Sequence, residues 1–321
     1  MVPAVRVLVT GGAGFIGSHV AEAALAAGHE VCVLDDLSTG HRRNVPEKAR
    51  LFQVDVRDGA SLRAAFAEAR PQWVSHQAAQ ASVAVSVRRP LLDAEVNVLG
   101  SLQVMEACLA QGVERLVFAS TGGAIYGEVE EGRLADEAHP TRPVSPYACA
   151  KLSVEHYLAG YAHEHGLRST VLRYANVYGP RQDPHGEAGV VAIFVGRMLR
   201  GEPVQVNARR APGDAGCVRD YVHVDDVVAA NLAALEGRVA EPVLNVCTGV
   251  DTATRDLAER LRALLGSASE LRDGPRRAGD LERSVLDPAR LARVLPARVP
   301  LAEGLARTVD WFRAERDEPR G

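Results

Sequence analysis

Residues 5–17 have the sequence VRVLVTGGAGFIG, in which a short apolar run is followed by a group of glycines. The apolar run, residues 5–10, has the length and the β-branched content of a buried strand. The residues from Phe15 to Ala27 repeat apolar side chains at helical spacing. This stretch therefore predicts a strand, a tight glycine turn and a helix in immediate succession.

The three glycines of this turn, Gly11, Gly14 and Gly17, have separate tasks in such a unit. The first allows the tight turn, the second lets a phosphate group approach the backbone, and the third lets the helix pack against the strand. The first helical turn, which includes Phe15 and Ile16, presents free N–H groups and the positive end of the helix dipole. No Gly-Lys-Ser/Thr sequence follows, so the turn is not that of a P-loop. A purely structural turn is the alternative, but the flanking strand and helix favour a dinucleotide pyrophosphate site.

The alternation of apolar runs and helical patterns continues as far as Tyr174. Such an order is typical of βαβ units, in which right-handed crossovers build a parallel sheet covered by helices on both faces. We therefore expect an α/β fold with a doubly wound parallel sheet, the Rossmann type. The expected strands are Val5–Thr10, Val31–Leu34, Leu51–Val54, Trp73–His76, Arg115–Ala119 and Ser169–Tyr174, and the expected helices are Phe15–Ala27, Ser61–Arg70, Leu91–Gln111 and Tyr147–His165.

The pattern changes after Tyr174, where glycine and proline become frequent. Residues 1–174 are expected to form the dinucleotide-binding domain, with residues 218–248 crossing back to it. Residues 175–217 and 249–321 are expected to form a smaller C-terminal α/β lobe. The elements expected here are the helices Val190–Arg200, Asp225–Leu235 and Leu301–Arg313 and the strands Val204–Val206, Val218–Val224 and Val243–Val246.

The overall composition is that of an ordinary globular enzyme. Of the 321 residues, 47% are hydrophobic and 24% are charged, and the formal net charge is −4. This charge gives no reason to expect nucleic acid or an anionic membrane as a partner. No apolar run is long enough to span a bilayer, and the five scattered cysteines lack metal-ligand spacing. We therefore expect no metal site and a cytoplasmic protein with reduced thiols.

Asp35 stands at the end of the second expected strand. A carboxylate at this place binds the hydroxyls of an adenine ribose and disfavours a 2′-phosphate, which predicts NAD rather than NADP. Its neighbour Asp36 could share or take this role. His41, Arg42 and Arg43 keep NADP as the alternative, although a solvated loop is the better interpretation of these three residues.

Tyr147 and Lys151 have the spacing Tyr-x-x-x-Lys, which places both side chains on one face of a helix. A phenol with a pKa of about 10 is a weak base at neutral pH, and a nearby ammonium, together with the positive nicotinamide ring, favours the phenolate and lowers that pKa. Tyr147 could then take a proton from a substrate hydroxyl while hydride leaves the same carbon. Lys151 is one of only two lysines in the chain, the other being Lys48. An exposed helical pair is the alternative interpretation.

These motifs resemble the extended form of the short-chain dehydrogenase/reductase family, over nearly the whole chain from Val5 to Arg313. The resemblance includes the glycine spacing, Asp55-Val56 after the third strand, Gln77-Ala78-Ala79 after the fourth strand and Asn97 in the next helix. It implies an NAD-binding Rossmann fold with catalysis by Tyr147 and Lys151. The cofactor-binding residues that it implies are Gly11, Gly14, Phe15, Ile16, Gly17, Asp35, Asp36, Asp55, Val56, Gln77, Ala78, Ala79, Asn97, Ser120, Tyr147, Lys151 and Tyr174.

The family places a catalytic hydroxyl at the end of the fifth strand, here within ASTGGAIYG at residues 119–127. The usual position, counted back from Tyr126, holds Gly122. We expect the neighbouring Thr121 to supply the catalytic hydroxyl and Ser120 to support the cofactor. The sugar dehydratases of this family carry an Asp-Glu pair here, whereas the two glycines of this chain offer no acid or base, so we expect no dehydration.

Three further motifs resemble the segments with which this family binds a nucleotide sugar. They are LRYANVYGP at residues 172–180, VRDYVHVDD at residues 218–226 and RRAGD at residues 276–280. The resemblance implies two arginine clamps for a diphosphate, which the planar guanidinium suits. It also implies that Tyr174 lies over the nicotinamide. The implied substrate-binding residues are Thr121, Tyr147, Asn176, Arg219, Arg277, Asp280 and Ser284, of which Asn176, Arg219 and Arg277 bind the diphosphate and Asp280 a ribose hydroxyl.

Within the family, the sequence most resembles the UDP-glucose 4-epimerases. This implies NAD-dependent epimerisation of UDP-glucose or UDP-galactose through a transient 4-keto sugar, which swings over while its diphosphate stays bound. The small Ser284 stands where a bulky residue can crowd an N-acetyl group, so the N-acetylhexosamine forms could also be accepted. The alternatives are a UDP-glucuronate 4-epimerase or decarboxylase, a nucleotide-sugar reductase and a non-catalytic NAD-sensing protein.

The resemblance also implies a homodimer. In this family the two subunits meet in a four-helix interface, and the expected helices Leu91–Gln111 and Tyr147–His165 would supply it.

Overall fold

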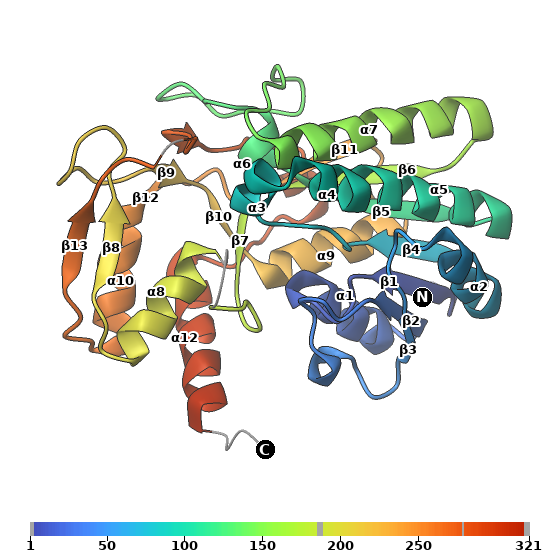
Figure 1. Cartoon of the computed structure of the whole chain (residues 1–321), viewed down its shortest axis with the longest axis horizontal. Coiled ribbons are helices and arrows are strands. Elements are labelled where there is room, and N and C mark those ends of the chain that lie inside the picture. Colours follow the sequence, from blue (N-terminus) through green and yellow to red (C-terminus); the bar gives the residue numbers. More distant parts are fainter. Residues whose placement is uncertain (1–2, 185–188, 278, 318–321) are drawn as a thin grey trace.

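A parallel sheet of seven strands forms the centre of the computed structural model, which describes residues 3–184, 189–277 and 279–317. The strand order is β11-β6-β5-β4-β1-β2-β3, so the direction of winding reverses between β1 and β4 (Figure 1). In open α/β sheets, ligands bind outside the carboxyl ends of the strands at such a reversal. The predicted doubly wound fold is confirmed. The strands are β1 Arg6–Thr10, β2 Glu30–Asp35, β3 Arg50–Gln53, β4 Trp73–His76, β5 Arg115–Thr121, β6 Ser169–Tyr174 and β11 Val243–Val246.

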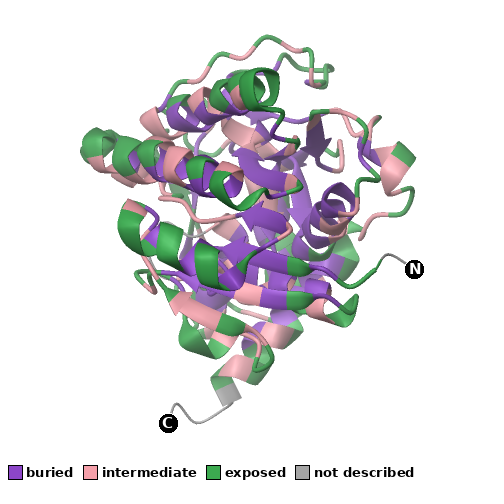
Figure 2. Ribbon diagram, turned by 90° about the vertical axis from the view of Figure 1, so that its right-hand side faces the viewer, coloured by how far each residue is buried: buried purple, intermediate pink, exposed green. Residues whose placement is uncertain are grey.

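Helices cover both faces of this sheet. Alternate residues of β1 serve separate cores, because Val7 and Val9 pack in one cluster and Leu8 packs in the other. Figure 2 shows the strands as buried and the outer sides of the helices as exposed. The cluster with Val7 includes α1 (Phe15–Ala26) and α9 (Val224–Leu235), and the cluster with Leu8 includes α2 (Gly59–Ala69), α5 (Gly100–Gln111) and α7 (Pro146–His165).

The predicted helix Leu91–Gln111 is helical throughout but not uniform. It consists of α4 (Pro90–Ala94), a π-helical turn at Glu95–Leu99 and α5, and the short α3 (Val83–Arg88) precedes it. Gly112 ends α5 in the left-handed conformation, with φ of 64°. A π-helical turn shifts the register of the side chains that follow it, and such turns are frequent at functional sites.

The C-terminal elements form a third core beside the sheet, on the left in Figure 1. This core joins α8 (Val190–Leu199), α10 (Thr254–Leu265) and α12 (Leu301–Asp317). Its small sheets pair β8 (Val204–Asn207) with β13 (Leu271–Gly274), β7 (Asn176–Tyr178) with β10 (Tyr221–His223), and β9 (Val218–Arg219) with both β12 (Thr252–Ala253) and β14 (Arg283–Ser284). The remaining short helices are α6 (Gly122–Ile125), α11 (Leu291–Val294) and a 3₁₀ turn at Arg42–Asn44.

The prediction of one continuous strand over Val218–Val224 is wrong, because the backbone breaks at Asp220 between β9 and β10. The Asp220 carboxylate is fully buried and accepts hydrogen bonds from the Thr248 N–H (3.0 Å), the Thr248 hydroxyl (2.6 Å) and the Gly249 N–H (2.9 Å). A buried carboxylate must find such donors, and the break in the strand lets it reach them. Asp220 thus ties the chain between β9 and β10 to the chain that follows β11.

No helix within the described ranges is long and apolar enough to cross a membrane. The same residues contain no cluster of histidine, cysteine, aspartate or glutamate that could hold a metal ion. All five cysteines are free thiols.

Candidate active site

The glycine turn packs tightly against the end of β4. Gly11 has a φ of 65°, and a Cβ there would come within 2.6 Å of the Ala78 nitrogen. A Cβ at Gly17 would overlap the Gly11 carbonyl oxygen, so the third glycine lets α1 lie directly on the turn. Gly14 precedes Phe15 and Ile16 at the start of α1, and no side chain caps this first helical turn. The open N-terminus suits a phosphate group.

Asp35 lies beside the glycine turn at the end of β2. Its carboxylate is buried and accepts hydrogen bonds from the N–H groups of Ala13 (3.0 Å) and Leu37 (2.8 Å). Burial raises the pKa of this carboxyl, and the two N–H donors oppose the rise. Asp36 is exposed and accepts from the N–H and hydroxyl of Ser38. Of the two carboxylates, Asp35 is the one next to the turn.

Asp55 and Val56 follow β3, as expected, but the Asp55 side chain has a partner that the sequence did not suggest. Its carboxylate accepts from the backbone N–H of Arg57 (2.9 Å) and pairs with the Arg57 guanidinium. This arginine holds the pKa of Asp55 below its usual range. Val56 is buried, and a Cβ at Gly100 of α5 would come within 2.7 Å of it.

The stretch Gln77-Ala78-Ala79 leads away from β4, and Gln77 joins a buried polar group. Its side-chain nitrogen lies 2.9 Å from the Ser75 hydroxyl, 3.2 Å from the Tyr174 hydroxyl and 3.0 Å from the Asn231 oxygen. Asn231 of α9 also donates to the Tyr174 hydroxyl (2.8 Å). Burial raises the pKa of Tyr174 to about 12, so its phenol stays protonated. Sequence analysis missed Asn231, whose helix is far away in the chain.

His76 is a further residue that sequence analysis missed. It ends β4 next to β1, where the winding reverses, and it is fully buried. Its Nδ1 lies 2.7 Å from the Thr10 hydroxyl and its Nε2 lies 2.9 Å from the Ser101 hydroxyl. Since the Ser101 hydroxyl donates to the Asn97 carbonyl (2.6 Å), it accepts from a protonated Nε2. Burial lowers the pKa of His76 to about 3, so the ring is neutral.

Asn97 lies in the π-helical turn and holds the chain after β4. Its side chain accepts from the Gln80 N–H (2.9 Å) and donates to the Gln80 carbonyl (2.9 Å) and to Asp93 (2.9 Å). The Asp93 carboxylate also accepts from the Gln80 side chain (2.7 Å) and is fully buried. Asp93 was not predicted, because an isolated aspartate in an expected helix gives no signal of burial.

The predicted pair Tyr147 and Lys151 lies in the first two turns of α7. Ser145 caps this helix by accepting from the Ala148 N–H (3.2 Å). The Thr121 hydroxyl at the end of β5 lies close enough to the Tyr147 phenol to lower its pKa, against the larger effect of burial. Lys151 is buried and donates from Nζ to the Ala119 carbonyl (2.9 Å). One lysine, one tyrosine and one threonine therefore meet at the carboxyl edge of the sheet.

Burial governs the pKa of Tyr147 in this structure. Burial and the negative charge of Asp93 raise the pKa of Tyr147 to about 12. That Lys151 and a nicotinamide ring together lower this pKa stays a prediction. The Lys151 ammonium donates to the Ala119 carbonyl and is itself desolvated. Burial lowers the pKa of Lys151 to about 8, while the charges of Asp93 and Glu155 act in the opposite direction.

The loop after Thr121 explains the glycine at the usual hydroxyl position. A Cβ at Gly122 would overlap the Leu286 side chain, so this position points into the core. Neither Gly122 nor Gly123 carries an acid or a base. Ser120 donates to Glu155 (2.5 Å), which pairs with Arg173 (2.6 Å) inside the protein. The Ser120 hydroxyl is therefore directed to α7, and its expected contact with the cofactor stays a prediction.

Two of the predicted substrate residues lie at Gly123, and a third, Arg219, pairs with one of them. The Ser284 hydroxyl donates to the Gly123 carbonyl (3.2 Å), and Ser284 is the register partner of Arg219 in the β14–β9 pair. A Cβ added to Gly123 would lie 3.7 Å from the side-chain nitrogen of Asn176. Arg219 donates to the Val218 carbonyl (2.9 Å) and forms no ion pair with any carboxylate of residues 3–184, 189–277 and 279–317. Its charge is therefore free for an anionic ligand.

Arg277 and Asp280 lie on the connection between β13 and β14. Arg277 is exposed and has no ion pair within the described part of the chain. The charge of Asp280 reaches Cys217, next to β9, and raises the pKa of its thiol together with burial. Ala278, which stands between them, lies outside the described residues. The structure thus brings Asp280 toward β9 and leaves the Arg277 side chain exposed on this connection.

The doubly wound sheet, the glycine turn and the Tyr147–Lys151 pair after β5 define an extended short-chain dehydrogenase/reductase. The chain belongs to the NAD dependent epimerase/dehydratase family, whose model matches residues 7–247.

Similar proteins support a narrower comparison. A UDP-glucose 4-epimerase of Mycolicibacterium smegmatis is 44% identical over 315 residues, which are 96% of this chain and 98% of that protein. The crystal structure of the Thermus thermophilus UDP-glucose 4-epimerase in complex with NAD has a TM-score of 0.92 and 57% identity, covering 96% of this chain and 99% of that one. The crystal structure of the Thermotoga maritima UDP-glucose 4-epimerase with UDP-glucose has a TM-score of 0.91 and 46% identity, covering 97% and 99%.

Proposed function

We propose that this chain is an isomerase that interconverts UDP-glucose and UDP-galactose at carbon 4, with NAD as its cofactor. The observation that carries the proposal is the meeting of Thr121, Tyr147 and Lys151 beside a turn without a carboxylate. This set can remove and return a proton but offers no acid to expel water from the sugar. The relatives of similar length named above are UDP-glucose 4-epimerases.

The residues present fit a dinucleotide. The uncapped start of α1 and the close packing at Gly11 leave backbone N–H groups free for the pyrophosphate, and Asp35 stands where the adenine ribose hydroxyls would lie. Lys151 would hold the nicotinamide ribose. NAD, when bound, supplies the acceptor and donor of hydride.

The residues of the chain supply the remaining steps. Tyr147 takes the proton of the 4-hydroxyl and later returns it, and Thr121 donates a hydrogen bond to the same oxygen. Because burial keeps Tyr147 protonated on its own, the positive charge of a bound nicotinamide ring must favour the phenolate. Asn176, Arg219 and Arg277 would hold the diphosphate while the transient 4-keto sugar turns over. Ser284 would leave space beside carbon 2 for an N-acetyl group.

Proton NMR of UDP-galactose incubated with the purified protein, without added NAD, tests this function. Appearance of UDP-glucose would support epimerisation with a retained cofactor. A nucleotide-sugar reductase would need cofactor added in proportion to product, and a non-catalytic NAD-binding protein would give no product. If UDP-galactose stays unchanged even with NAD present, the assignment fails for this sugar, and a uronate epimerase or decarboxylase becomes the leading candidate.

A homodimer through α4, α5 and α7 also belongs to this proposal. Exposed apolar side chains on these and the preceding helix support it, since Leu91 is 79% and Val87 61% exposed. A hollow of about 530 Å³ lies along the outer side of α7, with Tyr157 and Tyr161 among its lining residues. Light scattering should give twice the chain mass for the wild type and the single mass for Leu91→Glu; a monomeric wild type would contradict the proposal.

Two further expectations are part of the same proposal. We place the protein in the cytoplasm, which its five free thiols support. We also propose that residues 1–174 with 218–248 form the NAD-binding domain and that 175–217 and 249–321 form the nucleotide-sugar lobe. The separate apolar core around α8, α10 and α12 supports this division, as do β11 at the edge of the main sheet and α9 on its face.

A further inference from the structure

Arg283 is a buried arginine next to Ser284, and each nitrogen of its guanidinium donates to a protein acceptor. The residue is only 5% exposed. Its Nε and Nη2 donate to the two carboxylate oxygens of Asp251 at 2.9 and 2.8 Å. Its Nη1 donates to the carbonyls of Glu130 and Arg133, both at 2.7 Å. A buried charge needs such partners, so these acceptors fix where this guanidinium lies.

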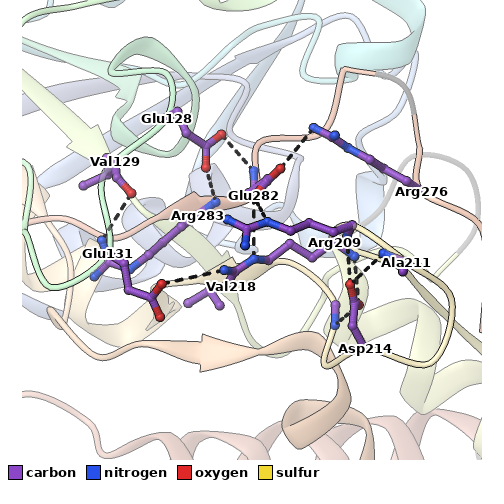
Figure 3. A network of polar contacts seen from close by, with 12 residues as sticks. Glu128, Val129, Glu131, Arg209, Ala211, Asp214, Val218, Arg276, Glu282 and Arg283 are labelled. Atoms are coloured by element: carbon purple, nitrogen blue, oxygen red, sulfur yellow. Dashed lines mark hydrogen bonds and ion pairs between the residues drawn. The ribbon is translucent and has the colours of Figure 1, made fainter.

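The backbone of β14 is attached to the same segment. The Glu128 carboxylate accepts from the N–H groups of Glu282 (2.9 Å) and Arg283 (2.6 Å), and the Val129 N–H donates to the Arg283 carbonyl (3.1 Å). Figure 3 shows Glu128 facing this backbone and Arg283 running toward Val129. Side chain and main chain of one residue therefore bind residues 128–133.

The segments that meet at Arg283 are those that carry the candidate site. Residues 128–133 belong to the connection between α6 and α7, which begins shortly after Thr121 and ends shortly before Tyr147. Asp251 directly precedes β12, whose Thr252 pairs with Arg219. On the other side Arg219 pairs with Ser284. A shift of β14 would therefore move the Ser284 hydroxyl away from Gly123 and disturb the strand that holds Arg219.

We propose that Arg283 is a positioning residue of the sugar pocket. By tying Asp251 and residues 128–133 to β14, it fixes the separation between Ser284 and the Gly123 turn, and with it the space open to the sugar. The proposal rests on the function proposed above. Arg283 acts through Ser284 and Arg219, because its guanidinium is buried and each of its nitrogens already donates to a protein acceptor.

The test compares Arg283→Met, Arg283→Lys and Asp251→Asn with wild type, using two nucleotide sugars. The readouts are kcat and KM for UDP-galactose and the competitive Ki of UDP-N-acetylgalactosamine in the same assay, which is measurable whether or not that sugar turns over. In Arg283→Met, we expect KM to rise about tenfold and kcat to stay within about threefold of the wild-type value. The reason is that β14 with Ser284 moves, whereas Tyr147 and Thr121 keep their places. The ratio of Ki to KM should fall, because the displaced β14 weakens the binding of the smaller sugar more than that of the sugar with an N-acetyl group. Arg283→Lys and Asp251→Asn should lie between wild type and Arg283→Met.

Arg290→Met is the matched control. Arg290 pairs with Glu137 (3.2 Å) and also ties the α6–α7 connection to the chain after β14, but this pair includes no residue of β14. This variant should lose thermal stability and keep the wild-type ratio of Ki to KM. The proposal would be overturned by an unchanged ratio of Ki to KM in Arg283→Met and Asp251→Asn, or by an equal change of this ratio in Arg290→Met. In either case an active wild type would still support the epimerase function. An inactive wild type would instead contradict the proposed function itself.

Discussion

The hydroxyl of Thr121 lies beside the phenol of Tyr147 and acts to lower its pKa, and the backbone that brings them together leaves no room for a side chain at Gly122. The residue before the usual position therefore carries the hydroxyl, because β5 extends to Thr121 and the next residue turns into the core against Leu286. In this loop the hydroxyl stands at position 121 in place of position 122, and it still lies beside Tyr147.

Replacing Thr121 tests this relationship. Thr121→Ala should lower kcat for UDP-galactose about 100-fold, because one donor to the reacting oxygen is lost, and Thr121→Ser should restore most of it. The double variant Thr121→Ala with Gly122→Ser should stay inactive, since the added side chain collides with Leu286. Steady-state kinetics measure all three. Recovery in the double variant would show that the hydroxyl can act from position 122.

Asp93 should set the pH range of the reaction. Its negative charge raises the pKa values of both Tyr147 and Lys151, so Asp93→Asn should lower both. Activity needs an ionised Tyr147 and a charged Lys151, so both limbs of the kcat profile should move to lower pH by about half a unit to one unit. The other charged or titratable groups that act on this pair are Glu155 of α7, His76 of β4 and Tyr174 of β6.

The control for this prediction separates charge from structure. Asparagine keeps an acceptor for Gln80 and Asn97, so the melting temperature of Asp93→Asn should stay close to that of the wild type. If kcat fell equally at every pH and neither limb of the profile shifted, Asp93 would act only by holding the side chains of Gln80 and Asn97.

His76 should make the folded state sensitive to acid. Its pKa is about 3 when folded and 6.5 when unfolded, so the unfolded chain binds the extra proton between these values. The folded state therefore loses stability as pH falls below about 6.5, at up to roughly 1.4 kcal/mol per pH unit from this residue. His76→Gln removes the titration and keeps a donor for Ser101. Urea unfolding at several pH values between 7 and 4 should give a shallower decline for the variant; parallel declines would contradict the prediction.

Much of the fold could be predicted from the sequence because its signals are local. The glycine turn at Gly11 and the apolar strands each depend on neighbours in the chain, and the structure agrees with them to within a few residues. The break at Asp220 was missed, since it depends on backbone N–H groups at Thr248 and Gly249, almost thirty positions away.

In the candidate site too, the residues with a local sequence signal could be predicted, and those that depend on distant segments could not. Tyr147 and Lys151 are one helical turn apart and were visible as a motif, and Thr121 was visible as the hydroxyl beside Gly122. Asp93 and Arg283 were not visible, because each acquires its setting only when distant segments close around it. Burial is also the largest influence on the pKa of Tyr147, and no spacing in a sequence reports how far a phenol is removed from water.

Ser284 should decide how the protein treats sugars with an N-acetyl group. Its side chain is 1% exposed and lies against the Gly123 carbonyl, so a larger residue must project into the space beside the turn. Ser284→Tyr should lower kcat/KM for UDP-N-acetylgalactosamine about 100-fold, and for UDP-galactose less than about tenfold, because only the acetamido group needs that volume. Ser284→Ala, which removes the hydroxyl without filling the space, is the control and should keep the wild-type preference between the two sugars. Equal losses on both sugars in Ser284→Tyr would mean that the residue supports the turn at Gly123 and does not border carbon 2.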